Sequence, residues 1–241
     1  MLELLIVMSI IIILIALLAP TLRPVRVKAD LTKELSTHHQ LLAALNLYAG
    51  DSKQYFPYFA TPGDPSGPIR VRDFDLAQQD KPYFLAQAGY WPSIVVPRYL
   101  SSKVGLMLDK LAGREPFHTP WPDYIIPTDY FLSHTVHAAP GYWVGDEPPE
   151  NLGLLRGTTW DQVRYPSNKT ILLQMIAADG PKGGPDPKIN YIDTTVGLAD
   201  GSAKVVFYPP ENFEKNIVTR PFGAKSLPSL STRNGLDGRD Y

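Results

Sequence analysis

The sequence predicts an α+β fold in which one long N-terminal helix packs, through its distal half, on a small antiparallel sheet. Three observations predict this arrangement. Residues 4–19 form an uncharged apolar run, residues 27–49 repeat apolar side chains at helical spacing, and residues 194–207 alternate around an Asp-Gly pair as a β-hairpin does. The 24 prolines and 18 glycines indicate many turns and argue against a helical bundle.

Composition excludes several classes of function. The chain has 241 residues and a formal net charge of −1, so nothing indicates bulk binding to nucleic acid. It contains no cysteine, which excludes disulfides, thiolate chemistry and cysteine-ligated zinc or iron–sulfur clusters. Its length is sufficient for a single domain with a buried core.

Residues 1–22 are predicted to form a transmembrane or assembly helix. As a helix, residues 4–19 rise about 24 Å, which is short of a hydrocarbon core of about 30 Å. A cleaved secretory signal is disfavoured because no basic residue precedes the apolar run. A plain signal anchor remains open. Glu3, at the edge of this run, needs a cationic partner in lipid, and Pro20 is expected to bend or loosen the helix.

The order Leu2-Glu3-Leu4-Leu5, the apolar run and Pro20 together resemble the N-terminal segment of type IV pilins and type II secretion pseudopilins. In that family the glutamate neutralises the N-terminal amine of a neighbouring subunit as the helices bundle into a filament. The resemblance therefore implies an assembly role for Glu3. It also implies a single-pass protein of the inner membrane with a periplasmic head, and self or other pilin-like subunits as partners.

Two features depart from the family pattern. The cleavage site for prepilin peptidase is absent because the chain starts inside the motif, so we expect an upstream leader if this peptidase is a partner. Arg23, Arg26 and Lys28 follow the apolar run, and the positive-inside rule would place them in the cytoplasm. Pilin-like topology places them outside, so basic residues in the leader would have to oppose them.

Residues 23–50 are predicted to continue the helix in amphipathic form, with Gly50 as its C′ residue. We expect a globular pilin-like head at 51–208 and an irregular, partly disordered tail at 209–241. The apolar face of the helix is formed by Val27, Leu31, Leu35, His38, Leu42, Leu45 and Ala49.

Within the head, residues 51–68 are predicted to form a loop. In residues 69–112 the sequence predicts only a short helix, within 76–89. Strands are predicted at 130–136 and 170–176. His134 and His137 would then lie on opposite faces of a strand, which is poor geometry for chelating a metal.

The hairpin is the clearest local signal. Asp200-Gly201 predicts a two-residue type I′ turn, because both central positions of that turn need positive φ. The expected register places Ala199 opposite Ser202, Leu198 opposite Ala203 and Val196 opposite Val205. In that register Val196, Leu198, Ala203, Val205 and Phe207 share one face.

The hairpin carries a second resemblance. Prepilin-type processing-associated envelope proteins end with a histidine, nine residues and Asp-Gly, and Leu198-Ala199-Asp200-Gly201-Ser202 is similar to that pattern. Asn190 stands where the histidine would be, so a role that needs histidine protonation or metal binding would be lost.

A calcium site is a further candidate. The loop at 178–193 carries Asp179, Asp186 and Asp193, and such oxygen ligands suit Ca²⁺. Major pseudopilins hold calcium in a loop near the C-terminal sheet. Lys182 and Lys188 weaken the site, so an ion-free loop without cofactor is the favoured interpretation.

The predicted function is a non-enzymatic structural subunit, a pseudopilin or minor pilin that assembles through its N-terminal helix. No Gly-x-Ser-x-Gly, His-Glu-x-x-His or Walker-type sequence is present. The alternative is a signal-anchored extracytoplasmic enzyme or a glycan- or peptide-binding domain that uses aromatic residues around Trp91, Trp121 and Trp143. Core packing is the favoured interpretation of those aromatics.

Overall fold

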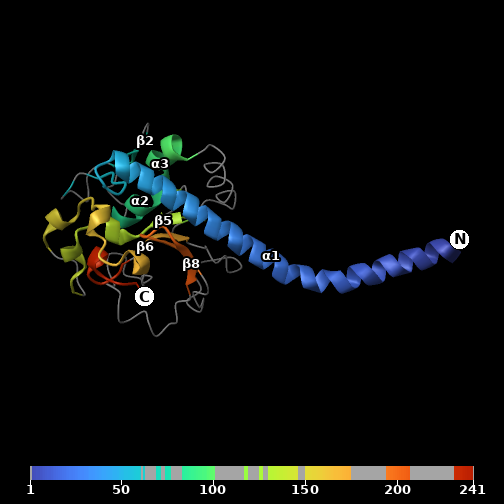
Figure 1. Cartoon of the computed structure of the whole chain (residues 1–241). Coiled ribbons are helices and arrows are strands. Elements are labelled where there is room, and N and C mark those ends of the chain that lie inside the picture. The colour runs from blue at the N-terminus through green and yellow to red at the C-terminus, as the bar shows by residue number, and fades with distance from the viewer. Residues whose placement is uncertain are drawn as a thin grey trace.

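The computed structural model describes residues 2–60, 62, 69–71, 74–76, 83–100, 117–118, 125–126, 130–145, 150–174, 194–206 and 231–240. They form an α+β fold (Figure 1). The α-helices are α1 (Leu2–Asp51), α2 (Tyr83–Tyr90) and α3 (Pro92–Tyr99). The strands are β1 (Ile69–Val71), β2 (Phe74–Leu76), β3 (Phe117–His118), β4 (Ile125–Ile126), β5 (Tyr130–Leu132), β6 (Thr170–Gln174), β7 (Thr194–Leu198) and β8 (Ala203–Val206).

The two helical stretches predicted at 1–22 and 23–50 form one helix. α1 is about 75 Å long at 1.5 Å per residue. Figure 1 shows its distal half crossing the head, while its N-terminal half projects away and curves. Pro20 and Pro24 lie inside the helix, and each lacks the N–H that would bond to the carbonyl four residues earlier.

The predicted apolar face of α1 is confirmed where the helix meets the head. Its buried members are His38, Leu42, Leu45 and Ala49, while Leu31 and Leu35 are half-buried. Leu41 and Ala44 are also buried and widen the face. This buried face of α1 packs on β7, β8 and α3.

The predicted helix end at Gly50 is wrong. α1 continues to Asp51, and the left-handed conformation falls instead on Lys53 (φ 53°) and Gln54 (φ 67°). Gln54 N–H donates to Ala49 O at 2.7 Å. The reversal that these residues make brings Phe56 N–H to Thr158 O at 3.0 Å, so a tertiary hydrogen bond determines where the chain turns.

The head is built on a four-stranded antiparallel sheet with the order β5-β6-β7-β8. Tyr130 pairs with Gln174, and Leu173 pairs with Val196. β1–β2 and β3–β4 form two further two-stranded ribbons. The main core lies between α1, the sheet and α3, and a second cluster gathers around Phe84 and Trp143.

The β-hairpin forms, but its predicted two-residue turn is wrong. Gly197 pairs with Ala203, and Leu198 N–H donates to Ser202 O at 2.8 Å, so three residues make the loop. Gly201 has φ +85°, whereas Asp200 is not among the described residues with positive φ. The pattern matches a type I turn followed by a left-handed glycine.

Contacts with neighbouring segments explain the longer turn. Ala199 N–H donates to Lys169 O at 2.9 Å, and Asp200 N–H donates to Pro166 O at 3.2 Å. The Asp200 carboxylate accepts bonds from the backbone N–H and the hydroxyl of Ser202. These bonds hold the extra residue in the loop.

The one-residue slip also overturns the predicted shared face. Val196 now pairs with Lys204, so Val196 and Leu198 lie on the face opposite to Ala203 and Val205. Thr195 and Gly197 point toward α1 instead. Both faces of β7 are buried, which is why alternation alone does not identify the register. Phe207 lies outside the described residues.

The strand predicted at 130–136 stops early. β5 ends at Leu132, and a 3-10 helix, η1, covers His134–His137. Ser133 Oγ and Thr135 Oγ1 are hydrogen-bonded at 2.8 Å, and Val136 N–H donates to Ser133 O at 3.2 Å. These local bonds offer the backbone an alternative to the strand. Residues 170–174 of the second predicted strand are β6.

The prediction of a loose C-terminal tail is wrong for residues 231–240. Leu236 is fully buried, and Ser231, Thr232 and Asp240 are buried with it. The segment carries a short 3-10 helix, η7 (Gly235–Asp237). Its closing residue, Asp240, pairs with a buried lysine of the sheet, and sequence spacing gives no sign of that partner.

Gly197 tests the contact between α1 and the sheet. A Cβ at this position would lie 2.9 Å from Leu42 Cδ1 and 3.3 Å from His38 Nδ1. We expect Gly197→Val to lower the free energy of unfolding by about 1–3 kcal/mol, as overpacking does. The measurement is urea unfolding followed by circular dichroism. Gly50→Ala is the control, since nothing lies within 4 Å of that site, and a comparable loss there would contradict the interpretation.

Candidate functional site

The projecting half of α1 carries an exposed apolar stripe. It consists of Leu4, Val7, Met8, Ile11 and Ile12, whose exposed fractions lie between 45% and 68%. They belong to the run of residues 4–19, in which every residue except Ser9 is apolar. Large exposed apolar surfaces mark sites of protein or membrane contact. We call these five side chains the apolar stripe.

The predicted assembly residues flank this stripe on the same helix. Glu3 lies in the first turn of α1, where a carboxylate is favoured by the helix dipole. Pro20 follows 17 positions later, roughly 26 Å along the axis. No helix in the described part of the chain is both long enough and apolar enough to cross a membrane.

The Asp200-Gly201 turn lies against α1, far along the helix from Glu3. His39 Nδ1 donates to Gly201 O at 2.9 Å. Sequence analysis did not anticipate this bond, which gives the turn a histidine partner from α1. The calcium candidates Asp179, Asp186 and Asp193, and also Asn190, lie outside the described residues, and within the described ones no group of three potential metal ligands occurs.

Where α1 packs on the sheet, a contact that we call the joint, three buried side chains are linked by hydrogen bonds. Thr195 Oγ1 donates to Gln174 Oε1 at 2.7 Å, so it accepts from His38 Nε2 at 3.1 Å. These two hydrogen bonds connect α1 to β7 and β7 to β6. Burial lowers the pKa of His38 to about 4, so the neutral ring is the stable form at neutral pH.

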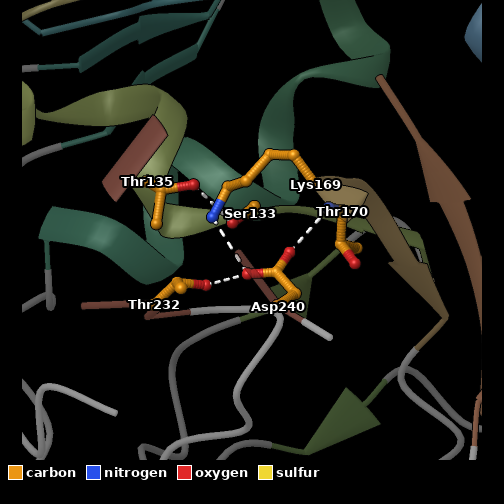
Figure 2. Close-up of polar contacts among 6 residues, drawn as sticks. All are labelled: Ser133, Thr135, Lys169, Thr170, Thr232 and Asp240. Atoms are coloured by element: carbon orange, nitrogen blue, oxygen red, sulfur yellow. Dashed lines mark hydrogen bonds and ion pairs between the residues drawn. The ribbon is translucent and has the colours of Figure 1, made fainter. Parts of the chain in front are cut away.

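A second buried centre joins the sheet to the C-terminal segment (Figure 2). Lys169 Nζ forms an ion pair with Asp240 Oδ1 at 3.0 Å, and both side chains are fully buried. The same carboxylate accepts the N–H of Thr170 at 2.6 Å and the hydroxyl of Thr232. Burial lowers the pKa of Lys169, and the negative charge of Asp240 opposes this shift.

The bonds of this centre clamp the C-terminal segment to β6. A buried lysine beside serine and threonine hydroxyls has the composition of a nucleophilic site. Lys169, Ser133 and Thr135 have no solvent-exposed surface. The arrangement instead satisfies every oxygen of Asp240 within the core and anchors the chain end to β6.

The third buried centre contains the two histidines of η1. In a 3-10 helix residues three apart eclipse, so His134 and His137 lie on one side rather than on the opposite faces predicted for a strand. His134 Nδ1 is hydrogen-bonded to Ser231 Oγ at 3.2 Å. Burial lowers the pKa of His134 to about 3, and burial together with His134 lowers the pKa of His137.

The tryptophans considered for ligand binding are in the core. Trp91 and Trp143 are fully buried, and Trp91 Nε1 donates to Tyr130 O at 2.8 Å. They therefore line no surface groove, which agrees with the core packing expected for the aromatics. Trp121 lies outside the described residues.

The clamp predicts a large effect of removing one charge. We expect Asp240→Asn to lower the free energy of unfolding by about 3–5 kcal/mol, because Lys169 would be left buried without its counterion. Urea unfolding at neutral pH measures this. Asp237→Asn, an exposed neighbour, is the matched control and should change stability by less than about 0.5 kcal/mol. Equal effects of the two variants would contradict the clamp.

The buried histidines predict acid sensitivity. The folded-state pKa values of His38 and His134, about 4 and about 3, lie below the unfolded value of about 6.5. Their contribution to stability is therefore full above pH 6.5 and is lost as the pH falls toward those values. We expect each to cost about 2 kcal/mol between pH 7 and pH 5.

Urea unfolding as a function of pH checks this expectation. His38→Asn should reduce the slope of stability against pH by about 1.4 kcal/mol per unit below pH 6, which corresponds to one proton. An unchanged slope would show that His38 does not titrate differently in the two states.

No family model, curated protein or solved structure matches the chain. Its function therefore has to be inferred from its own residues. Those residues offer an exposed apolar stripe on a projecting helix, a firmly packed joint that holds this helix, and buried polar centres.

Proposed function

We propose that the protein is a non-enzymatic structural subunit that assembles with copies of itself, or with other pilin-like subunits, through the N-terminal half of α1. In this proposal the chain is tethered at the inner membrane, its head lies in the periplasm, and the assembly is an envelope filament or a type II secretion-like apparatus. The observation that carries the proposal is the apolar stripe on a helix that projects from the head.

The apolar stripe supports assembly because it has no partner among the described residues of its own chain. Each large apolar side chain moved from water into an apolar contact contributes about 1.5–3 kcal/mol. Two such helices side by side would cover both stripes at once. A helix that is apolar nearly all round, as the sequence of residues 4–19 is, is normally buried among partners.

The joint supports the proposal because its hydrogen bonds hold α1 in a fixed orientation relative to the head. His38, Thr195 and Gln174 form a buried chain across α1, β7 and β6. At the hairpin turn itself, His39 Nδ1 donates to Gly201 O. A helix held in this way would present the head at a defined angle to each neighbour in an assembly.

Glu3 has the role of charge partner in this proposal, by resemblance to pilins. A carboxylate among packed apolar helices needs a cation, and the N-terminal amine of a neighbouring subunit would supply it. The chemistry thereby fixes the stagger between subunits. Pro20 loosens the helix between the stripe and the joint, since it removes one backbone hydrogen bond.

The absence of cysteine allows a direct test in the full chain. We expect Ile12→Cys to form disulfide-linked dimers under mild oxidation in membranes, because disulfides require Cα atoms within about 7 Å. Val144→Cys, an exposed apolar position on the head, is the matched control and should stay monomeric. Cross-linking at Val144 but not at Ile12 would contradict assembly through the helix.

Glu3→Ala in the Ile12→Cys background tests the charge partner. Leaving an amine unpaired in an apolar setting costs about 2.5–3.5 kcal/mol, so cross-linking should fall on the order of 100-fold. Lys28→Ala removes an exposed charge of the same helix and serves as control. Undiminished cross-linking and unchanged recovery in sheared filaments would refute the role of Glu3.

A further inference from the structure

A cavity of about 410 Å³ opens beside the C-terminal end of α1. Its lining comes from the last turn of α1, from the segment that follows α1 and from a distant loop. It includes Tyr48, Tyr55, Tyr58, Arg156 and Gly157. The volume lies within the range of small-molecule sites. Figure 1 shows that α1 ends on the side of the head away from its projecting half. The cavity therefore stays open when the projecting half packs with other helices.

The walls of the cavity are held together by the fold. Tyr55 and Thr159 form an antiparallel bridge, and Trp160 N–H donates to Gln54 O at 2.8 Å. Tyr58 Oη donates to Leu155 O at 3.2 Å, which ties one wall to the other. Such a site exists before a ligand arrives, so binding requires little ordering of the protein.

Gly157 shapes the floor between two aromatic rings. A Cβ on this residue would lie 3.3 Å from the Tyr58 Cβ and Cγ atoms and 3.6 Å from Tyr55 Cδ1. The missing side chain lets both rings approach the loop closely. The result is a concave surface with aromatic walls rather than a flat patch.

The charge in the cavity is positive and unpaired. Arg156 is exposed and has no hydrogen-bond or ion-pair partner in the part of the chain that the structure describes, and no carboxylate is among the described residues that line the cavity. The nearby carboxylate of Asp51 is bound by Arg98 at 3.5 Å and by the Tyr99 hydroxyl at 3.0 Å. A guanidinium presents a fork of donors that matches a carboxylate.

The polar groups that a ligand could reach in this cavity belong to side chains and not to the backbone. The Tyr48 and Tyr55 hydroxyls have no hydrogen-bond partner among the described residues, whereas the backbones of the two walls bond to each other, as in the bond from Phe56 N–H to Thr158 O. An extended peptide would need a free strand edge, and this site offers none at that contact. A ligand with hydroxyls, a ring and a carboxylate would complement the tyrosine hydroxyls, the aromatic rings and the Arg156 guanidinium.

We propose that this cavity binds a carboxylated sugar, with its ring against Tyr55 and Tyr58 and its carboxylate on Arg156. The site is independent of the assembly proposed above, since it uses the other end of α1. A head carried on an assembled helix would then bind acidic glycan through this cavity. Aromatic and arginine side chains in one hollow are the residues that most often dominate binding energy.

The test compares two ligands that differ mainly in the carboxylate. Calorimetric titration of the full chain at low salt should show saturable binding of trigalacturonic acid and at least tenfold weaker binding of galactotriose. Arg156→Gln should remove this preference, and Tyr55→Ala should weaken the binding of both sugars. Arg164→Gln, an exposed arginine elsewhere on the head, should bind trigalacturonic acid within twofold of the parent chain.

The outcomes separate the alternatives. Thermal unfolding establishes that each variant is folded before titration. Tighter binding of a short acetylated peptide with a free carboxylate than of trigalacturonic acid would overturn the assignment to a sugar. No saturable binding of either carboxylated probe, or an equal loss in the Arg164→Gln and Arg156→Gln variants, would overturn the site itself.

Discussion

The close approach of α1 to β7 is the contact on which the rest of the molecule depends. Gly197 leaves room for Leu42, and His38 Nε2 is hydrogen-bonded to Thr195 Oγ1 at the same contact. A larger residue at 197 would separate the helix from the sheet. The core between α1, β6 and α3 would then lose its common wall, because Leu41, Leu42 and Leu45 all reach it from one side of the helix.

Buried hydrogen bonds and an ion pair, in addition to apolar packing, hold distant segments of the head together. Lys169, His38 and His134 are each buried, and each is bonded to a residue far away in the sequence. A buried charge or ring nitrogen tolerates few alternative arrangements, since an unpaired one is costly. These centres therefore specify one packing of the sheet, the helix and the chain end, at the expense of tolerance to acid.

The sequence predicted the elements whose signal is local. The face of α1 follows from a period of 3.6, and the positions of the hairpin and of β6 follow from Asp-Gly and an apolar run. The register, the early end of β5 and the packed chain end did not follow. The register and the packed chain end depend on Pro166, Lys169 and Asp240 meeting partners that only the fold brings near. The early end of β5 depends on local hydrogen bonds of Ser133 that compete with the strand. The cavity beside Arg156 was missed for the same reason, because its two walls lie about 100 positions apart.

The clamp between residues 169 and 240 also sets an order of events during synthesis. The Lys169–Asp240 pair cannot form until residue 240 has emerged from the ribosome, whereas α1 is complete at residue 51. At 5–20 residues per second the intervening stretch takes roughly 10–40 s to make. The apolar helix is thus complete and free to meet a partner well before the Lys169–Asp240 pair can join the last described residues to the sheet.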